Sequence, residues 1–116
     1  MNRLLLAALA VAVSLLLAPV TDVGAADAPP PEIPLVIEKN RFQPDVLRVK
    51  AGAPFVLVVT NKDRTPEEFD MQQPRIEKVI PAGKTVRLRM PALQPGAYNF
   101  VGEYHAETAK ARLVAE

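Results

Sequence analysis

The chain has 116 residues, no cysteine, one histidine and a formal net charge of +1. This length fits one small domain. The lack of cysteine excludes disulfides, thiolate zinc sites, thiol nucleophiles and copper–thiolate centres, and a single histidine excludes any site built from several histidines of one chain. Lysine and arginine are scattered among aspartate and glutamate, so there is no basic stripe for nucleic acid, and a nucleic-acid-binding function is excluded.

The first 26 residues have the pattern of a secretory signal peptide: Arg3, then an apolar run, then small residues up to Ala26. A membrane anchor is the alternative, but the run is about 14 residues long and ends before Pro19, whereas a spanning helix needs about 20. We therefore predict that residues 1–26 are a signal peptide cleaved after Ala25 or Ala26. The mature protein is expected to be periplasmic and not embedded in the membrane.

Residues 27–34 are rich in proline and are predicted to form an extended, poorly ordered arm. Short apolar runs separated by turn residues follow. Residues 55–60 are apolar or β-branched throughout, as in a strand buried on both faces, and residues 86–90 alternate apolar and basic side chains, as in a strand with one face in water. The predicted strands are 35–37, 46–49, 55–60, 76–80, 86–90, 97–101 and 109–114. This pattern predicts an all-β fold, an antiparallel Greek-key β-sandwich spanning residues 35–116.

Two segments between the predicted strands carry unusual side chains. Thr65–Met71 holds three carboxylates and a thioether, and Gly102–Thr108 holds the single histidine. Loops at one end of a sandwich cluster even when they are far apart in sequence, so these two segments are expected to converge. Carboxylate, imidazole and thioether groups together suit iron or copper, whereas calcium would not choose histidine or methionine. The candidate metal ligands are Glu67, Glu68, Asp70, Met71, Glu77, Glu103 and His105.

Each candidate also has a purely structural interpretation. Acidic residues in a loop are commonly solvated, and a single loop histidine is commonly a surface residue. Met71 lies two residues after Phe69, so in an extended segment it would share the same face and belong to the core. Glu77 can be a charge on the exposed face of a strand, and Tyr104 is assigned to packing. Spacing alone therefore indicates an extracytoplasmic β-sandwich with a candidate metal site.

Two stretches resemble the two halves of the cupredoxin fold, together covering about Leu35 to Glu116. In the opening half of that fold, a strand ending in Asn-x-Asp leads to the first metal-binding loop, and in the closing half an aromatic strand delivers the second. The matching segments here are Phe42-Gln43-Pro44, Val49–Gly52, Phe55–Asn61 with Asp63, Pro95–Phe100 and Gly102–His105. Blue-copper members have a histidine after a proline in the first loop and a cysteine in the second. Because Glu67 and Glu103 stand near those positions, the resemblance implies no blue-copper centre.

A narrower resemblance is to the small periplasmic cupredoxin-like proteins of high-affinity iron-permease systems for ferrous iron. It is carried by Thr65–Phe69, Glu77–Val79, Gly102–His105 and Thr108–Lys110. The resemblance implies a copper- or iron-binding protein that acts as a redox component of iron uptake, with ferroxidase-type activity left open. The implied partners are ferrous or ferric iron and an inner-membrane iron permease with its periplasmic companions. A non-catalytic metal carrier and a metal-free docking module of the permease complex remain alternatives.

Within such a site, His105 would supply the one nitrogen ligand and Met71 a weak, soft one. One or more of the carboxylates would supply hard oxygen ligands, which favour the higher oxidation state of iron or copper.

Overall fold

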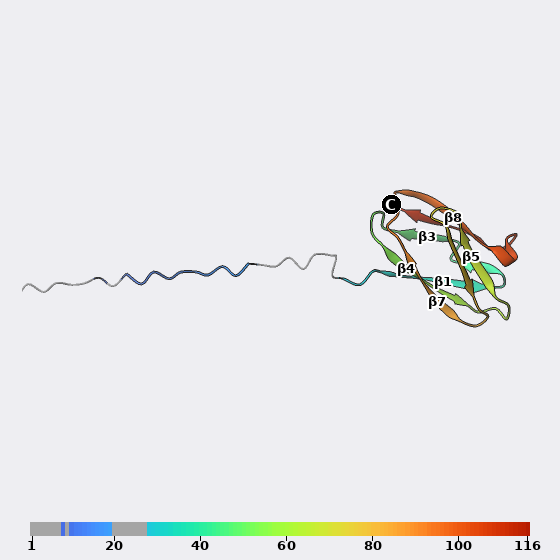
Figure 1. Cartoon of the computed structure of the whole chain (residues 1–116), viewed down its shortest axis with the longest axis horizontal. Helices are drawn as coiled ribbons and strands as arrows, with labels where there is room; N and C mark the ends of the chain where they lie inside the picture. Colours follow the sequence, from blue (N-terminus) through green and yellow to red (C-terminus); the bar gives the residue numbers. More distant parts are fainter. Residues whose placement is uncertain (1–7, 9, 20–27) are drawn as a thin grey trace, which may run out of the picture.

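The computed structural model describes residues 8, 10–19 and 28–116. In this part of the chain, nine strands form two sheets that pack face to face (Figure 1). The first sheet has the strand order β2-β1-β4-β7, and the second has the order β3-β9-β8-β5-β6. A short 3-10 helix, η2, links β8 to β9. The strand bounds are Glu32–Glu38 (β1), Arg41–Gln43 (β2), Val46–Val49 (β3), Phe55–Asn61 (β4), Glu67–Met71 (β5), Ile76–Ile80 (β6), Thr85–Met90 (β7), Gly96–Gly102 (β8) and Lys110–Ala115 (β9), and η2 spans Glu103–His105.

The predicted β-sandwich is confirmed, but its sheets are mixed instead of wholly antiparallel. Strand β1 pairs in parallel with β4, and β3 pairs in parallel with β9, while the other pairs are antiparallel. Parallel neighbours cannot be joined by a tight hairpin. Here the chain leaves the first sheet after β2, adds β3 to the second sheet and returns as β4, so β1 and β4 run in the same direction.

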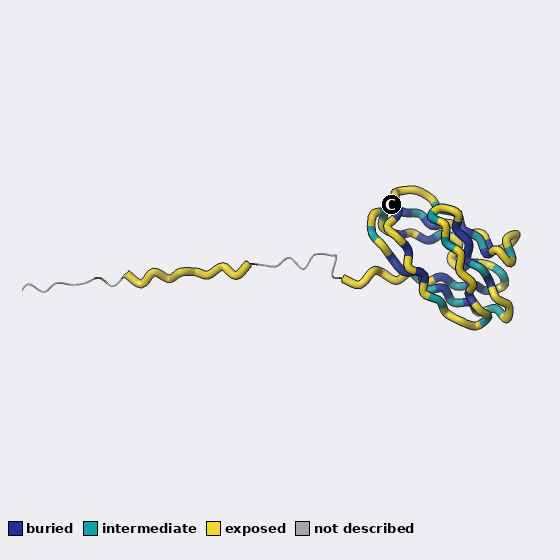
Figure 2. The backbone as a smooth tube through the Cα atoms, viewed as in Figure 1, coloured by how far each residue is buried: buried dark blue, intermediate teal, exposed yellow. Residues whose placement is uncertain are grey.

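The core is a single cluster between the two sheets (Figure 2). At its centre, Phe42 of the first sheet meets Phe100 of the second, with ring centroids 5.0 Å apart. Phe69 stacks on Phe100 at 4.8 Å. Such aromatic pairs add to the hydrophobic stabilisation that burial of the rings already provides. Because the chain has no cysteine, this contiguous core takes the place of disulfides in stabilising the fold.

The proline-rich arm is shorter than predicted, because β1 begins at Glu32. Ile33 and Pro34 lie beside Leu57 and Val58 of β4. On the other side of β1, strand β2 pairs only from Val36 onward, so the strand is open beside Pro34. A proline, which lacks a backbone N–H, is accepted where one side of a strand has no neighbour.

The predicted signal peptide falls largely outside the described residues, and so does its expected cleavage point. Residues 8 and 10–19, which are described, have no regular secondary structure and are exposed. None of the helices in the described part of the chain is long and apolar enough to cross a membrane.

The segment Thr65–Met71, predicted as a loop, becomes strand β5 from Glu67 onward. This strand is paired on both sides, with β6 and with β8. Its side chains therefore alternate between the two faces of the second sheet. Glu67 and Phe69 point to the inner face, whereas Glu68 and Asp70 point to the outer face. The sheet therefore separates Glu67 from the other two acidic residues of this segment.

Candidate metal centre

Three connections lie together at one end of the sandwich. In the turn between β1 and β2, Lys39 and Asn40 have positive φ values of 54° and 57°. Their backbone N–H groups donate to the Asp63 carboxylate at 2.8 and 2.9 Å. The Thr108 hydroxyl, from the segment after η2, donates to the Asn40 carbonyl at 2.6 Å. The β1–β2 turn, the β4–β5 loop and the β8–β9 connection are thus tied to one another.

At this end, Glu67 and His105 form a pair that we call the Glu67–His105 clasp. His105 Nδ1 lies 2.7 Å from Glu67 Oε2, and the Glu67 side chain is 0% exposed. The other carboxylate oxygen, Oε1, accepts the backbone N–H groups of Glu68 and Tyr104, both at 2.9 Å. A buried carboxylate is costly unless it is hydrogen-bonded, and these three contacts meet that need.

Gly102 is the residue that lets the clasp close. A Cβ atom at this position would lie 2.6 Å from Glu67 Cδ and 2.7 Å from the Ala109 Cβ. Its backbone angles are those of an ordinary extended residue, so close packing, not a special conformation, is the reason for glycine here.

The clasp fixes which nitrogen of the imidazole is free. An ionised Glu67 can only accept, so a neutral His105 imidazole would carry its proton on Nδ1 and donate it, which would leave the lone pair on Nε2. Histidines that bind metals are commonly held by a carboxylate in this way. The His105 side chain is 28% exposed and lines a surface hollow of about 440 Å³ together with Asn40 and Glu107. The clasp therefore presents one nitrogen ligand, with Glu67 as the group that orients it.

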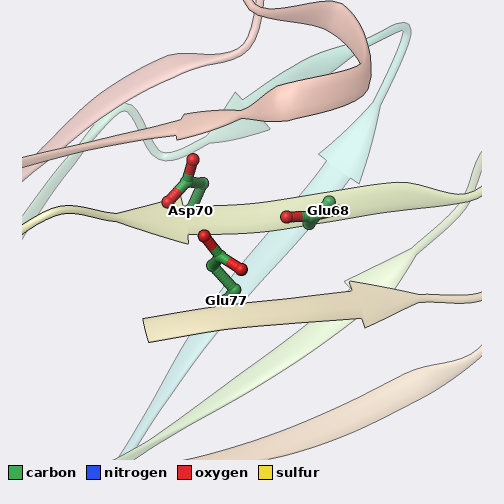
Figure 3. Close-up of side chains that lie close together, drawn as sticks. All are labelled: Glu68, Asp70 and Glu77. Carbon is green, nitrogen blue, oxygen red and sulfur yellow. The ribbon is translucent and has the colours of Figure 1, made fainter. Parts of the chain in front are cut away.

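A second acidic group lies on the outer face of the second sheet, and we call it the outer acidic cluster. It consists of Glu68, Asp70 and Glu77, each of which offers a carboxylate oxygen within 4.8 Å of the others (Figure 3). Asp70 is directly opposite Glu77 in the strand register and is 8% exposed. Arg75 contacts Glu77 at 2.5 Å, and the Gln72 amide contacts Asp70 at 3.5 Å. Arg75 offsets part of this negative charge, and carboxylates at this separation attract a further cation.

Tyr104 lies between the clasp and the outer acidic cluster. Its backbone N–H binds Glu67, while its side chain is 49% exposed, in contrast to the predicted packing role. Partial burial raises the pKa of the Tyr104 phenol above its ordinary value, and the neighbouring carboxylates of Glu68 and Glu67 raise this pKa further. The phenol therefore lies within the field of the cluster's negative charge.

The structure divides the seven predicted ligands instead of gathering them. Glu67 and His105 form the clasp, and Glu68, Asp70 and Glu77 form the outer acidic cluster. Met71 is 0% exposed and packs in the core, so its thioether faces away from the outer acidic cluster. Glu103 is exposed on η2 and is not one of the cluster's three carboxylates.

A blue-copper centre does not fit this arrangement. The chain has no cysteine, and Glu67, which stands where the resemblance places a histidine ligand, already has both oxygens engaged. What the structure offers instead is three oxygen donors on the sheet face and one imidazole nitrogen at the sheet end. The roles of Gly102 and Tyr104 could not be predicted from the sequence. Only the fold shows that Gly102 packs against Glu67 and that Tyr104 contacts both Glu67 and Glu68.

Comparison with known proteins agrees with the fold. Auracyanin A, a blue copper protein of Chloroflexus aurantiacus, is 15% identical, with a TM-score of 0.65 over 76% of this chain and 100% of that chain. Amicyanin of Paracoccus versutus is 17% identical, with a TM-score of 0.60 over 81% of this chain and 90% of that chain. The metal-binding domain of the Cu(I)-exporting P-type ATPase CopA of Streptococcus pneumoniae is 15% identical, with a TM-score of 0.63 over 73% of this chain and 84% of that chain.

Among curated proteins, the uncharacterized protein RP394 of Rickettsia prowazekii is 26% identical over 83 residues. The match spans 72% of this chain and 66% of that protein. Residues 5–115 match the family described as Cupredoxin-like domain. This match covers most of the sequence, so the chain belongs to the cupredoxin-like domain family.

Proposed function

We propose that this protein is a periplasmic metal-binding component of ferrous iron uptake that binds iron or Cu(II) without a blue-copper centre. The observation that carries the proposal is the outer acidic cluster, in which three carboxylates lie within 4.8 Å of one another. Hard oxygen ligands suit iron and Cu(II) and favour the higher oxidation state of either metal. The cupredoxin-like fold supports the proposal, because similar structures include copper-binding proteins.

The strand pairing explains how the chain would hold such an ion. Asp70 and Glu77 are fixed opposite each other on adjacent strands, and Glu68 lies two residues from Asp70 on the same face. The rigid sheet therefore pre-forms the oxygen donors, and little ordering is needed when a cation binds. His105 Nε2, held by the clasp, is a separate nitrogen donor at the sheet end.

Bound Fe(II) is the substrate in this proposal. Carboxylate ligands stabilise Fe(III) more than Fe(II), so they make the loss of one electron easier. With dioxygen as oxidant, four Fe(II), four protons and one O2 give four Fe(III) and two water molecules. The ferric product would then pass to an inner-membrane iron permease.

The test is a titration of Cu(II), and of Fe(II) without oxygen, into wild type and matched variants. Asp70→Asn and Glu68→Gln should each weaken binding by about 10-fold or more, because each removes a charged ligand. Glu103→Gln is the control, since it makes the same charge change on exposed η2, and it should leave affinity within about 2-fold. His105→Ala should weaken Cu(II) more than Fe(II), because imidazole suits copper. Equal affinity of Asp70→Asn and wild type would refute the outer acidic cluster as the binding site.

Two further measurements separate the redox role from its alternatives. In air, substoichiometric protein should consume many equivalents of Fe(II), followed with a chromogenic Fe(II) chelator; retention of one unoxidised equivalent would indicate a carrier. The clasp favours the second alternative, a metal-free docking module, because hydrogen bonds between protein groups join these segments. Protein purified from its native periplasm with neither copper nor iron would support that module and contradict the proposed function.

A further inference from the structure

The outer face of the second sheet has its charges sorted by strand. Asp70 on β5 is paired with Glu77 on β6 and with Val101 on β8, and Val101 is paired with Lys110 on β9. Directly paired residues point to the same side of a sheet. One row across this face therefore reads acid, acid, apolar, base.

The same sorting holds along the strands. The outer acidic cluster occupies β5 and β6, and Lys110 and Arg112, both exposed, occupy β9. Within the described residues, neither of these two cations has an ion-pair partner. Between them, β8 contributes the uncharged side chains of Asn99 and Val101. A shallow hollow of about 290 Å³ lies over the basic half, lined by Lys110, Asn99 and Arg112 and, from the segment before β3, by Asp45.

We propose that this face binds a second copy of the chain through a twofold axis that runs along β8. Such an axis exchanges the two sides of β8, so it places β5 of one copy over β9 of the other. Because Asp70 and Lys110 lie in one row on either side of Val101, Lys110 of each copy then faces Asp70 of the second copy. The uncharged outer side chains of β8 then pack against those of β8 in the second copy. Asp70, which has no cation partner in its own chain among the described residues, gains Lys110 of the second copy.

Two further observations favour a second copy as the occupant. On the outer face of the first sheet, Arg87 already forms an ion pair with Glu32 of the same chain. These two charges therefore need no partner from a second copy. Among residues 28–116, the exposed large hydrophobic side chains are Val79 and Tyr104. Val79 is paired with Glu68, and Tyr104 lies beside Glu68, so both border the acidic half of the proposed interface.

The proposed dimer has a consequence for metal binding, which rests on the proposed function. A metal ion in the outer acidic cluster and Lys110 of a second copy would compete for the same carboxylates. Metal loading should therefore dissociate the dimer, and the dimer should weaken the apparent metal affinity. Dimer formation in the presence of a chelator does not depend on this competition, so the two ideas can fail separately.

The test is sedimentation velocity of the exported protein with EDTA present, at protein concentrations up to about 100 µM. The dimer should form at about 20 mM salt, and its dissociation constant should rise about 10-fold or more by 0.5 M salt, because exposed charge pairs are screened. Lys110→Glu/Arg112→Glu and Asp70→Lys/Glu77→Lys should each be monomeric. A mixture of these two variants should form a heterodimer, because the reversed charges complement each other.

Lys62→Glu/Lys84→Glu is the matched control. It makes the same change in net charge as Lys110→Glu/Arg112→Glu at exposed positions next to β4 and β7 of the first sheet, and it should remain dimeric. A wild type that is monomeric at low salt would overturn the proposal. So would a dimer that persists in both charge-reversed variants, or a mixture of these variants that fails to associate. A dimer that survives saturating Fe(II) or Cu(II) would overturn the competition but not the interface.

Discussion

The substitution Glu67→Gln tests the clasp with almost no change of shape. In the wild type, an ionised Glu67 accepts from Nδ1–H of His105, and in the neutral imidazole this leaves Nε2 unprotonated. In the variant, the amide oxygen can keep the backbone N–H groups of Glu68 and Tyr104, and the new NH2 group then faces His105. Because an NH2 group donates, Nδ1 must accept, and the imidazole proton moves to Nε2.

The cost follows from the three hydrogen bonds that Glu67 makes. Hydrogen bonds to a charged group contribute about 1.5–3 kcal/mol each, against about 1 kcal/mol for neutral ones. Replacing the carboxylate by an amide keeps the bonds but makes them neutral, which over three bonds costs at least about 1.5 kcal/mol. A neutral amide is also less costly to bury than a carboxylate, so we expect a loss near the low end, about 2 kcal/mol. For a domain of this size that lowers the melting temperature by roughly 8–16 °C. Glu67→Ala would leave three part-buried donors unpaired, at up to about 1–3 kcal/mol each, and is expected to be less stable than Glu67→Gln.

The assay combines thermal unfolding with nitrogen NMR of the single imidazole, which distinguishes the two tautomers. Wild type should carry the proton on Nδ1 and Glu67→Gln on Nε2, and Cu(II) affinity at His105 should fall because its free nitrogen is lost. Glu103→Gln, on the same 3-10 helix, is the control and should change neither readout. An unchanged tautomer together with an unchanged melting temperature in Glu67→Gln would refute the clasp.

Three other predictions follow from the same geometry. Gly102→Ala should cost about 1–3 kcal/mol by overpacking against Glu67, measured by denaturant unfolding; unchanged stability would mean that the carboxylate does not lie there. The raised pKa of Tyr104 means that stability falls as pH rises above about 10, and Glu68→Gln should lower this pKa, measured by phenolate absorbance; an unchanged pKa would contradict the contact. Cu(II)-loaded protein should be nearly colourless with an ordinary type 2 spin-resonance spectrum, because the chain has no thiolate; an intense blue band would contradict the ligand assignment.

Much of the sandwich could be predicted because its strands carry strong local signals. Residues 55–60 are apolar or β-branched throughout, and the corresponding strand β4 lies between two neighbours in the first sheet. The alternation of Val86, Leu88 and Met90 with two arginines likewise matches β7, an edge strand with one wet face. The parallel pairings could not be predicted, since they depend on how the chain crosses between the sheets and not on any local pattern.

Strand β5 was missed because its sequence argues against a strand. Glutamate and aspartate are depleted in strands, and Pro66 precedes the segment. Tertiary contacts override that preference, because Phe69 and Met71 are buried in the core and both edges of the strand are paired. In a strand, successive side chains point to opposite faces, so Glu67 points inward and Glu68 outward. The two adjacent carboxylates therefore belong to different groups, Glu67 to the clasp and Glu68 to the outer acidic cluster.

The clasp itself could not be predicted because its parts depend on one another across the fold. A fully buried carboxylate is tolerated only if donors surround it, and the donors come from the backbone of Glu68 and Tyr104 and from His105. They reach it only because Gly102 has no side chain. The buried carboxylate thus holds η2 in place through its contacts with Tyr104 and His105. Within the described residues, the carboxylates on the outer face contact the side chains of Arg75, Gln72 and Tyr104, so they keep oxygens available to a cation or to a lysine of a second copy.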